Sequence, residues 1–291
     1  MLKKNINYVK AILAILIFSY VDLLTVIVLK KCFNMTIVKT DIKLLVLLDF
    51  ICSFIVMFLL VLVYKSDLIN EIKKTIKDIK ENKISKFIGT LFEAYAISLV
   101  FKIGSALVAG IILQILGLEP SVANNQEIIN EMFKISPALI FISACVFAPV
   151  EEEILFRLMP SKILKNKWVF IIVSGLIFGL RHVTSSITLL SEIFIIGIII
   201  DYLISHKEKR RLGVIVLCLI FIMYLGIYSF QYGNLLLKIK SFDINEVVNS
   251  IIYVSMGISF GYIYKKYNNI YINMGVHALN NTIGMLALFF K

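Results

Sequence analysis

Cysteine is scarce in this chain, and several common catalytic motifs are absent from it. The four cysteines lie far apart, and no two of them have the spacing of a disulfide framework or of a zinc-binding knuckle. The chain also has no phosphate-binding loop, no GxSxG nucleophile motif and no HExxH zinc motif. These absences argue against the enzyme classes that such motifs mark. We expect the cysteines to be core residues: Cys32, Cys52, Cys145 and Cys218.

Apolar residues are abundant, and they indicate that much of the chain lies in a lipid bilayer. Hydrophobic residues make up 59% of the 291 positions and the mean hydropathy is +0.91, whereas a soluble domain averages about 45–50% apolar residues. Several apolar runs approach the roughly 20 residues that a transmembrane helix needs. We therefore predict an all-α, polytopic transmembrane helical bundle of about eight or nine spans in the cell membrane. The expected spans are 8–29, 43–64, 87–117, 135–156, 168–189, 190–205, 213–230, 247–264 and 270–290.

Basic residues outnumber acidic ones, and their distribution predicts an orientation. The net charge is +11, and residues 65–86 hold seven lysines against four acids. Isoleucine and leucine recur there at three- and four-residue steps, which favours an amphipathic helix on the membrane surface over a solvated linker. Because cytoplasmic loops are enriched in Lys and Arg, we expect 65–86, 161–167 and 206–211 in the cytoplasm and 118–133 outside. These basic patches suit lipid headgroups better than nucleic acid.

Three glutamates and an arginine interrupt the apolar sequence at "APVEEEILFR", residues 148–157. Ionisable residues within a span are costly and usually face the interior of the bundle or an aqueous cavity. On a helix, Glu153 and Arg157 share a face at i,i+4 and can neutralise each other, whereas Glu152 points away from Arg157. The cluster predicts a buried ion pair beside a freer carboxylate. The alternative is a span that ends there, with its charges among the headgroups.

Histidine is also scarce, and two of the three histidines lie within apolar runs. In "FGLRH", Phe178 and His182 share a helical face, and in "HALNN" so do His277 and Asn281. A single buried histidine is usually a core residue. Two such histidines together with a carboxylate pair and an asparagine form a set that core packing does not require, and this set indicates a functional site.

These three stretches, in this order, resemble the signature motifs EExxxR, FxxxH and HxxxN of the CPBP intramembrane proteases. That family includes the CAAX prenyl endopeptidases and the bacteriocin-processing and self-immunity proteins known as Abi proteins. The resemblance covers 135–290, which we interpret as the catalytic membrane core, and residues 1–134 are interpreted as variable leading helices. Two features depart from the family. Leu158 stands where Gly is common, and a longer separation between His182 and His277 indicates an insertion at 206–246.

The resemblance implies an endopeptidase that acts on a membrane-associated protein or peptide without a cofactor. Glu152 would be the general base, His182 would share the water and protonate the leaving amine, and Glu153 would orient and neutralise Arg157. His277 and Asn281 would stabilise the oxyanion. The active site would lie toward the cytoplasmic side.

Three alternatives remain open at this point. Glu152, His182 and His277 would also suit zinc, with an open position for water. A protein acting in bacteriocin immunity or signalling would function mainly by binding. A transporter would use acids in or near the spans, for which the candidates are Asp22, Asp49, Glu93 and Asp201. The sequence leaves the substrate, the oligomeric state and the physiological role undetermined.

Overall fold

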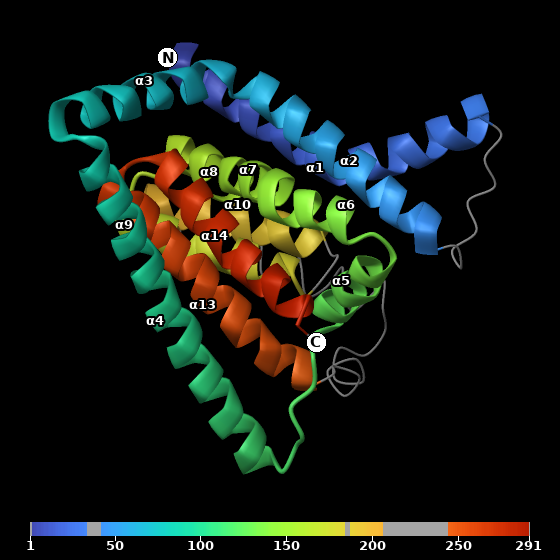
Figure 1. The fold of residues 1–291 in the computed structure, drawn as a ribbon. Helices are drawn as coiled ribbons and strands as arrows, with labels where there is room; N and C mark the ends of the chain where they lie inside the picture. Colours follow the sequence, from blue (N-terminus) through green and yellow to red (C-terminus); the bar gives the residue numbers. More distant parts are fainter. Residues whose placement is uncertain (1, 34–41, 184–186, 206–243, 291) are drawn as a thin grey trace.

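The computed structural model describes residues 2–33, 42–183, 187–205 and 244–290, and every regular element within these ranges is a helix (Figure 1). The predicted all-α class is therefore confirmed for the described part of the chain. The expected span 213–230 lies outside the described residues, as does nearly all of the expected insertion 206–246. The helices are α1 (Leu2–Phe33), α2 (Ile42–Val63), α3 (Lys65–Asn82), α4 (Ile84–Leu116), α5 (Asn124–Ile135), α6 (Pro137–Ile142), η1 (Ser143–Phe147), α7 (Ala148–Glu153), η2 (Ile154–Leu158), α8 (Met159–Ile163), α9 (Lys167–Arg181), α10 (Ile187–Ser205), α13 (Ile244–Tyr267) and α14 (Ile270–Leu288).

Three helices of the described chain are long and apolar enough to cross a membrane: Lys43–Val63, Ile84–Leu116 and Ile244–Tyr267. Two shorter apolar helices, Ile6–Val21 and Ile193–Ile204, accompany them. The expected count of eight or nine spans is not confirmed. One reason is length, because α9 has 15 residues and a full crossing needs about 20.

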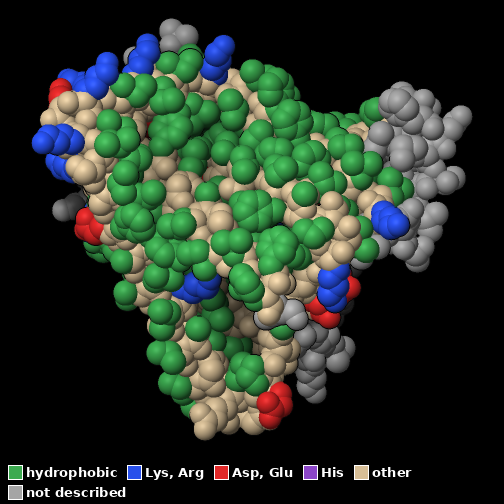
Figure 2. Space-filling model, in the orientation of Figure 1, with side chains coloured by type: hydrophobic (Ala, Val, Ile, Leu, Met, Phe, Trp, Pro, Cys, Tyr) green, Lys and Arg blue, Asp and Glu red, His purple; other side chains and the backbone are tan. Residues whose placement is uncertain are grey.

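The surface of the helical bundle separates apolar from basic side chains. In Figure 2, apolar side chains cover most of the visible face, and lysine and arginine side chains gather at the upper edge, where Figure 1 places α3. On α4, Leu107 is 65% exposed and Ile115 is 78% exposed. Exposed side chains of this kind suit contact with lipid tails, and the basic edge suits headgroups.

Glycines bring α9 and α13 into close contact. A Cβ at Gly175 would lie 2.7 Å from the backbone nitrogen of Ile258, and a Cβ at Gly179 would overlap the backbone of Val254. On the other side, a Cβ at Gly257 would lie 2.5 Å from the carbonyl oxygen of Gly175. Small residues spaced in this way let membrane helices approach closely. This close contact fixes the distance between α9 and α13, and therefore the relative positions of their side chains.

The helix that carries the glutamates is continuous from Pro137 to Ile163, but it is not a uniform α-helix. Two π-helical turns, Ser143–Phe147 and Ile154–Leu158, lie on either side of α7. Such turns are rare and frequently occur at functional sites. They change the direction of the side chains that follow them, which a 3.6-residue periodicity does not anticipate.

Helix α3 contacts helices from both the N-terminal and the C-terminal parts of the chain. Asp67 forms ion pairs with Lys10 of α1 (2.7 Å) and Lys162 of α8 (2.9 Å). Burial alone would raise the pKa of Asp67, but its hydrogen bonds and charge interactions with these two lysines outweigh burial and hold that pKa below its usual value. In addition, Tyr271 of α14 donates a hydrogen bond to the carbonyl of Leu68. These contacts hold α3 against the helices that carry the site.

Candidate active site

An ion pair lies at the centre of the motif residues. Nη1 of Arg157 is 3.2 Å from Oε1 of Glu153, and both side chains have 0% exposure. The guanidinium also donates from Nη2 to the carbonyl of Gly257 on α13 (3.2 Å). Its carbon lies 4.4 Å from the ring centre of Phe178 and 5.2 Å from that of Phe260. Opposite charge and two aromatic faces therefore surround a cation that has no contact with water.

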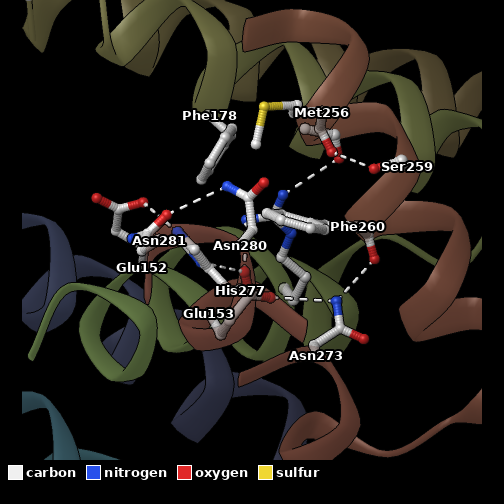
Figure 3. Close-up of polar contacts among 12 residues, drawn as sticks. Glu152, Glu153, Phe178, Met256, Ser259, Phe260, Asn273, His277, Asn280 and Asn281 are labelled. Carbon is white, nitrogen blue, oxygen red and sulfur yellow. Dashed lines mark hydrogen bonds and ion pairs between the residues drawn. The ribbon is translucent and has the colours of Figure 1, made fainter. Parts of the chain in front are cut away.

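Glu153 connects three helices through its two carboxylate oxygens. Besides pairing with Arg157, it lies 3.0 Å from Nδ1 of His277 and accepts a hydrogen bond from Nδ2 of Asn273 (3.2 Å). Asn273 donates as well to the carbonyl of Phe260 (2.8 Å). Figure 3 shows Asn273 and His277 directed toward Glu153. Because this one carboxylate of α7 contacts groups from η2 and α14, it fixes the relative positions of the three segments.

Sequence reasoning missed Asn273, although a signal for it was present. Asn273, His277 and Asn281 follow one another at intervals of four residues in α14. They therefore form a polar stripe on one face of an otherwise apolar helix. A search for the periodicity of polar residues within spans would have found it.

Glu152 is less enclosed than Glu153. Its side chain is 17% exposed, and Oε2 lies 3.7 Å from Nε2 of His277. This oxygen is buried and receives no hydrogen bond from any described residue. A buried carboxylate oxygen without a donor is unusual in a folded protein and indicates a functional role. Glu152 is thus the more exposed of the two carboxylates, whereas both oxygens of Glu153 have partners.

The two histidines approach the site from different helices and are held in defined orientations. Nδ1 of His182, at the end of α9, lies 2.8 Å from the carbonyl of Phe178. Its ring stacks on Tyr253 (4.9 Å, 14°) and contacts Phe178 (4.7 Å). A carbonyl only accepts, so Nδ1 of His182 carries a hydrogen, and in the neutral ring Nε2 then presents a lone pair. His277 likewise directs its Nδ1 toward the carboxylate of Glu153, which only accepts, so this nitrogen carries a hydrogen.

Phe178 explains why an aromatic residue precedes His182 by one turn. Its ring lies 4.7 Å from that of His182 and 5.6 Å from that of His277, and it covers the Arg157 guanidinium at 4.4 Å. The sequence motif places Phe178 beside His182 but indicates no separate role for it. In the structure it contacts the second and third motifs and the arginine of the first.

Asn281 lies at the edge of this cluster. Its Nδ2 donates to the carbonyl of Ala144 in η1 (2.7 Å), and its Oδ1 accepts from Nδ2 of Asn280 (3.3 Å) (Figure 3). One of the two amide hydrogens of Asn281 is used on Ala144, and a second remains. The asparagine is therefore anchored while still able to donate.

The sequence also left open a metal site at the motif residues and a transport path along other acidic residues. Within the described ranges, no three side chains among His, Cys, Asp and Glu are grouped closely enough to hold a metal ion. Two transporter candidates have partners of their own. Glu93 pairs with Lys266 (2.7 Å), and Asp201 accepts hydrogen bonds from the backbone nitrogens of Lys165 and Asn166. The side chain of Asp22 lies outside the described residues.

Comparison with protein families matches two overlapping segments of the chain, residues 134–239 and 192–283, to the family described as "Type II CAAX prenyl endopeptidase Rce1-like". Together the two segments span more than half of the chain and include all three motifs. No curated protein matches the chain significantly, and neither does any solved structure.

Proposed function

Because the chain belongs to the type II CAAX prenyl endopeptidase Rce1-like family, we propose that it is an intramembrane endopeptidase that hydrolyses a peptide bond of a membrane-associated protein or peptide. One observation carries the residue assignment. Glu152 has a buried carboxylate oxygen without a hydrogen-bond donor, and it lies beside His277 within a cluster that Glu153 and Arg157 hold rigidly. Membership of the family was predicted from the three motifs and is confirmed by this match.

In the proposed reaction, Glu152 is the general base. It accepts a proton from a water molecule as the water oxygen attacks the carbonyl carbon of the substrate. His182 is suited to share that water, because its Nε2 presents a lone pair. When the carbon–nitrogen bond breaks, the proton passes to the leaving nitrogen by way of Glu152 and His182. The products are then a carboxylic acid and an amine.

The negative oxygen of the tetrahedral intermediate requires donors. The second amide hydrogen of Asn281 is one donor, and Nε2 of His277 is the other. Since the Nδ1 hydrogen of His277 is directed at Glu153, donation from Nε2 requires a hydrogen on both ring nitrogens. Glu152 and Glu153 place two carboxylate groups beside the His277 ring. Glu153 and Arg157 thus act as supports and do not touch the substrate.

We place the site toward the cytoplasm, because the helix that bears the glutamates ends next to the basic segment 161–167. Labelling of single cysteines introduced in that segment tests the orientation. Reaction with a membrane-impermeant thiol reagent only after the cells are opened would support it. Reaction in intact cells would contradict it.

The decisive experiment compares the membrane proteomes of cells that carry the wild type and Glu152→Gln. The proposal predicts new peptide termini that appear only with the wild type. If the physiological effect of the protein persists with Glu152→Gln and no such termini are found, the protein acts by binding, as an immunity or signalling protein would.

Zinc analysis tests the metal alternative for the same site. Purified active protein should retain its activity after exhaustive chelation. About one zinc per chain, lost together with activity in both His182→Ala and His277→Ala, would show that these residues are metal ligands.

A further inference from the structure

Helix α4 carries a lysine where no charge is expected. Lys102 is the only charged residue between positions 94 and 118, in the middle of a helix that is long and apolar enough to span the membrane. A lysine at the centre of a span costs roughly 2.5–3.5 kcal/mol on insertion scales. Ile103 next to it is 58% exposed and Leu107 is 65% exposed, whereas Lys102 is only partly exposed. This lysine therefore turns away from the apolar surface toward the bundle.

The partner of Lys102 is an amide on α14. Nζ donates a hydrogen bond to Oδ1 of Asn280 (3.1 Å). Lys102 forms no ion pair with a described residue, so the cost of its position is not offset by a carboxylate there. A partly enclosed cation within a span that donates to a neutral amide, with no ion pair among the described residues, calls for a reason beyond packing.

Asn280 passes this contact on to the proposed oxyanion donor. Its Nδ2 donates to Oδ1 of Asn281 (3.3 Å), and Nδ2 of Asn281 donates to the carbonyl of Ala144 (2.7 Å). The three bonds run in one direction from Lys102 to Ala144. A lysine ammonium only donates, so it determines which end of the Asn280 amide faces α4. Asn280 then donates to Oδ1 of Asn281 and, together with the accepting carbonyl of Ala144, favours the arrangement in which Nδ2 of Asn281 faces η1. A reversed Asn281 would present an oxygen where the intermediate carries negative charge.

We propose that Lys102 and Asn280 are positioning residues that orient Asn281 as the oxyanion donor. This inference rests on the proposed peptidase function. The ammonium favours one arrangement of both amides, and the hydrogen bonds in such a chain strengthen one another in a medium of low dielectric constant. The relay also supplies a reason for a lysine in the middle of a lipid-facing helix. It predicts an effect on turnover rather than on substrate binding, because none of the three bonds involves the substrate.

The test measures kcat and KM for a synthetic, internally quenched peptide that contains the cleavage site found by the Glu152→Gln comparison. Lys102→Met removes the charge at similar length, and it should lower kcat by about 10- to 100-fold with KM nearly unchanged. Lys102→Arg keeps a donor and should retain most of the activity. Asn280→Ala should match Lys102→Met, and the double variant should be little worse than either, because both act through one relay. Lys86→Met, near the start of α4, is the matched control and should behave as the wild type.

The possible outcomes separate the inference from the proposed function. A higher KM with unchanged kcat in Lys102→Met would overturn the relay and make Lys102 a substrate-binding residue. Unchanged kcat in both Lys102→Met and Asn280→Ala would also overturn the relay, while leaving the peptidase function intact. If no cleavage anywhere depends on Glu152, the proposed function fails and the relay fails with it. Asn280→Ala keeps the test decisive if Lys102→Met does not fold.

Discussion

Replacing Glu153 with glutamine should damage the fold far more than the same change at Glu152. Glu153→Gln keeps the shape of the side chain but removes the one carboxylate among the described residues that forms an ion pair with Arg157. Both side chains have 0% exposure, so water cannot compensate the guanidinium once the carboxylate is gone. Glu152→Gln is a neighbouring control, because Glu152 is 17% exposed and its Oε2 lies 3.7 Å from Nε2 of His277.

The size of the effect follows from burial and from the remaining contacts. Removing one partner of a fully buried ion pair costs about 3–5 kcal/mol, because it leaves the other charge unpaired. The contact between Arg157 and Glu153 is ionic and lacks the alignment of a hydrogen bond, since Nη1 and Nε of Arg157 have no hydrogen-bond acceptor among the described residues. The rings of Phe178 and Phe260 remain in the variant and still stabilise the Arg157 guanidinium in part. We therefore expect Glu153→Gln to lower the free energy of unfolding by about 3 kcal/mol, the lower end of that range.

Thermal unfolding of purified protein in detergent, measured at one heating rate, provides the assay. A loss of about 3 kcal/mol corresponds to a midpoint lower by roughly 6–12 °C, on the scale of about 2–4 °C per kcal/mol for domains of comparable size. Glu152→Gln should unfold within about 2 °C of the wild type. The double variant Glu153→Leu with Arg157→Met should be more stable than Glu153→Gln, because no unpaired charge is left in the core.

Equal midpoints for Glu153→Gln and Glu152→Gln would refute this reasoning. They would show that the Arg157 guanidinium finds compensation elsewhere in the bundle. A double variant that is less stable than Glu153→Gln would show instead that the pair contributes net stability, and that burial of the charges is not its main cost.

Three further predictions concern the oxyanion donor, the packing of the helices and pH. Asn281→Ala should lower kcat by about 10²–10³ with little change in KM, and steady-state kinetics that show only a raised KM would contradict its role as a donor. Gly179→Ala should destabilise the protein by about 1–3 kcal/mol, because the added methyl overlaps the backbone of Val254, whereas Gly104→Ala, which meets nothing within 4 Å, should unfold as the wild type does. The pKa of Asp67 is lowered in the folded protein, so its contribution to stability is complete above its unfolded pKa of about 3.9 and is lost as the pH falls through the folded value. Unfolding midpoints of the wild type should therefore approach those of Asp67→Asn at pH 3, and a difference that stays constant from pH 6 to pH 3 would contradict this linkage.

The sequence by itself determined the class of the protein and the identity of its motif residues. Apolar runs predicted helices, because in lipid every backbone polar group must be satisfied within the chain. The four-residue interval between Glu153 and Arg157 predicted their pairing. In the structure, Oε1 of Glu153 lies 3.2 Å from Nη1 of Arg157. The family was identified by the resemblance of three stretches of the chain to its signature motifs, and each stretch keeps two side chains on one helical face.

Tertiary structure decided what each motif residue contacts. The intervals within a motif carry no information about the distance between motifs. Only the close approach of α9 and α13 at their glycines places Phe178 over Arg157, and only the packing of α14 against α7 brings His277 and Asn273 to Glu153. The number of spans could not be predicted from the sequence either. Composition identifies an apolar segment, but it does not tell whether that segment forms a helix long enough to cross the membrane. The π-turns beside the glutamates and the contact of Lys102 with Asn280 depend on packing between segments far apart in the chain, and for that physical reason no local pattern in the sequence predicts them.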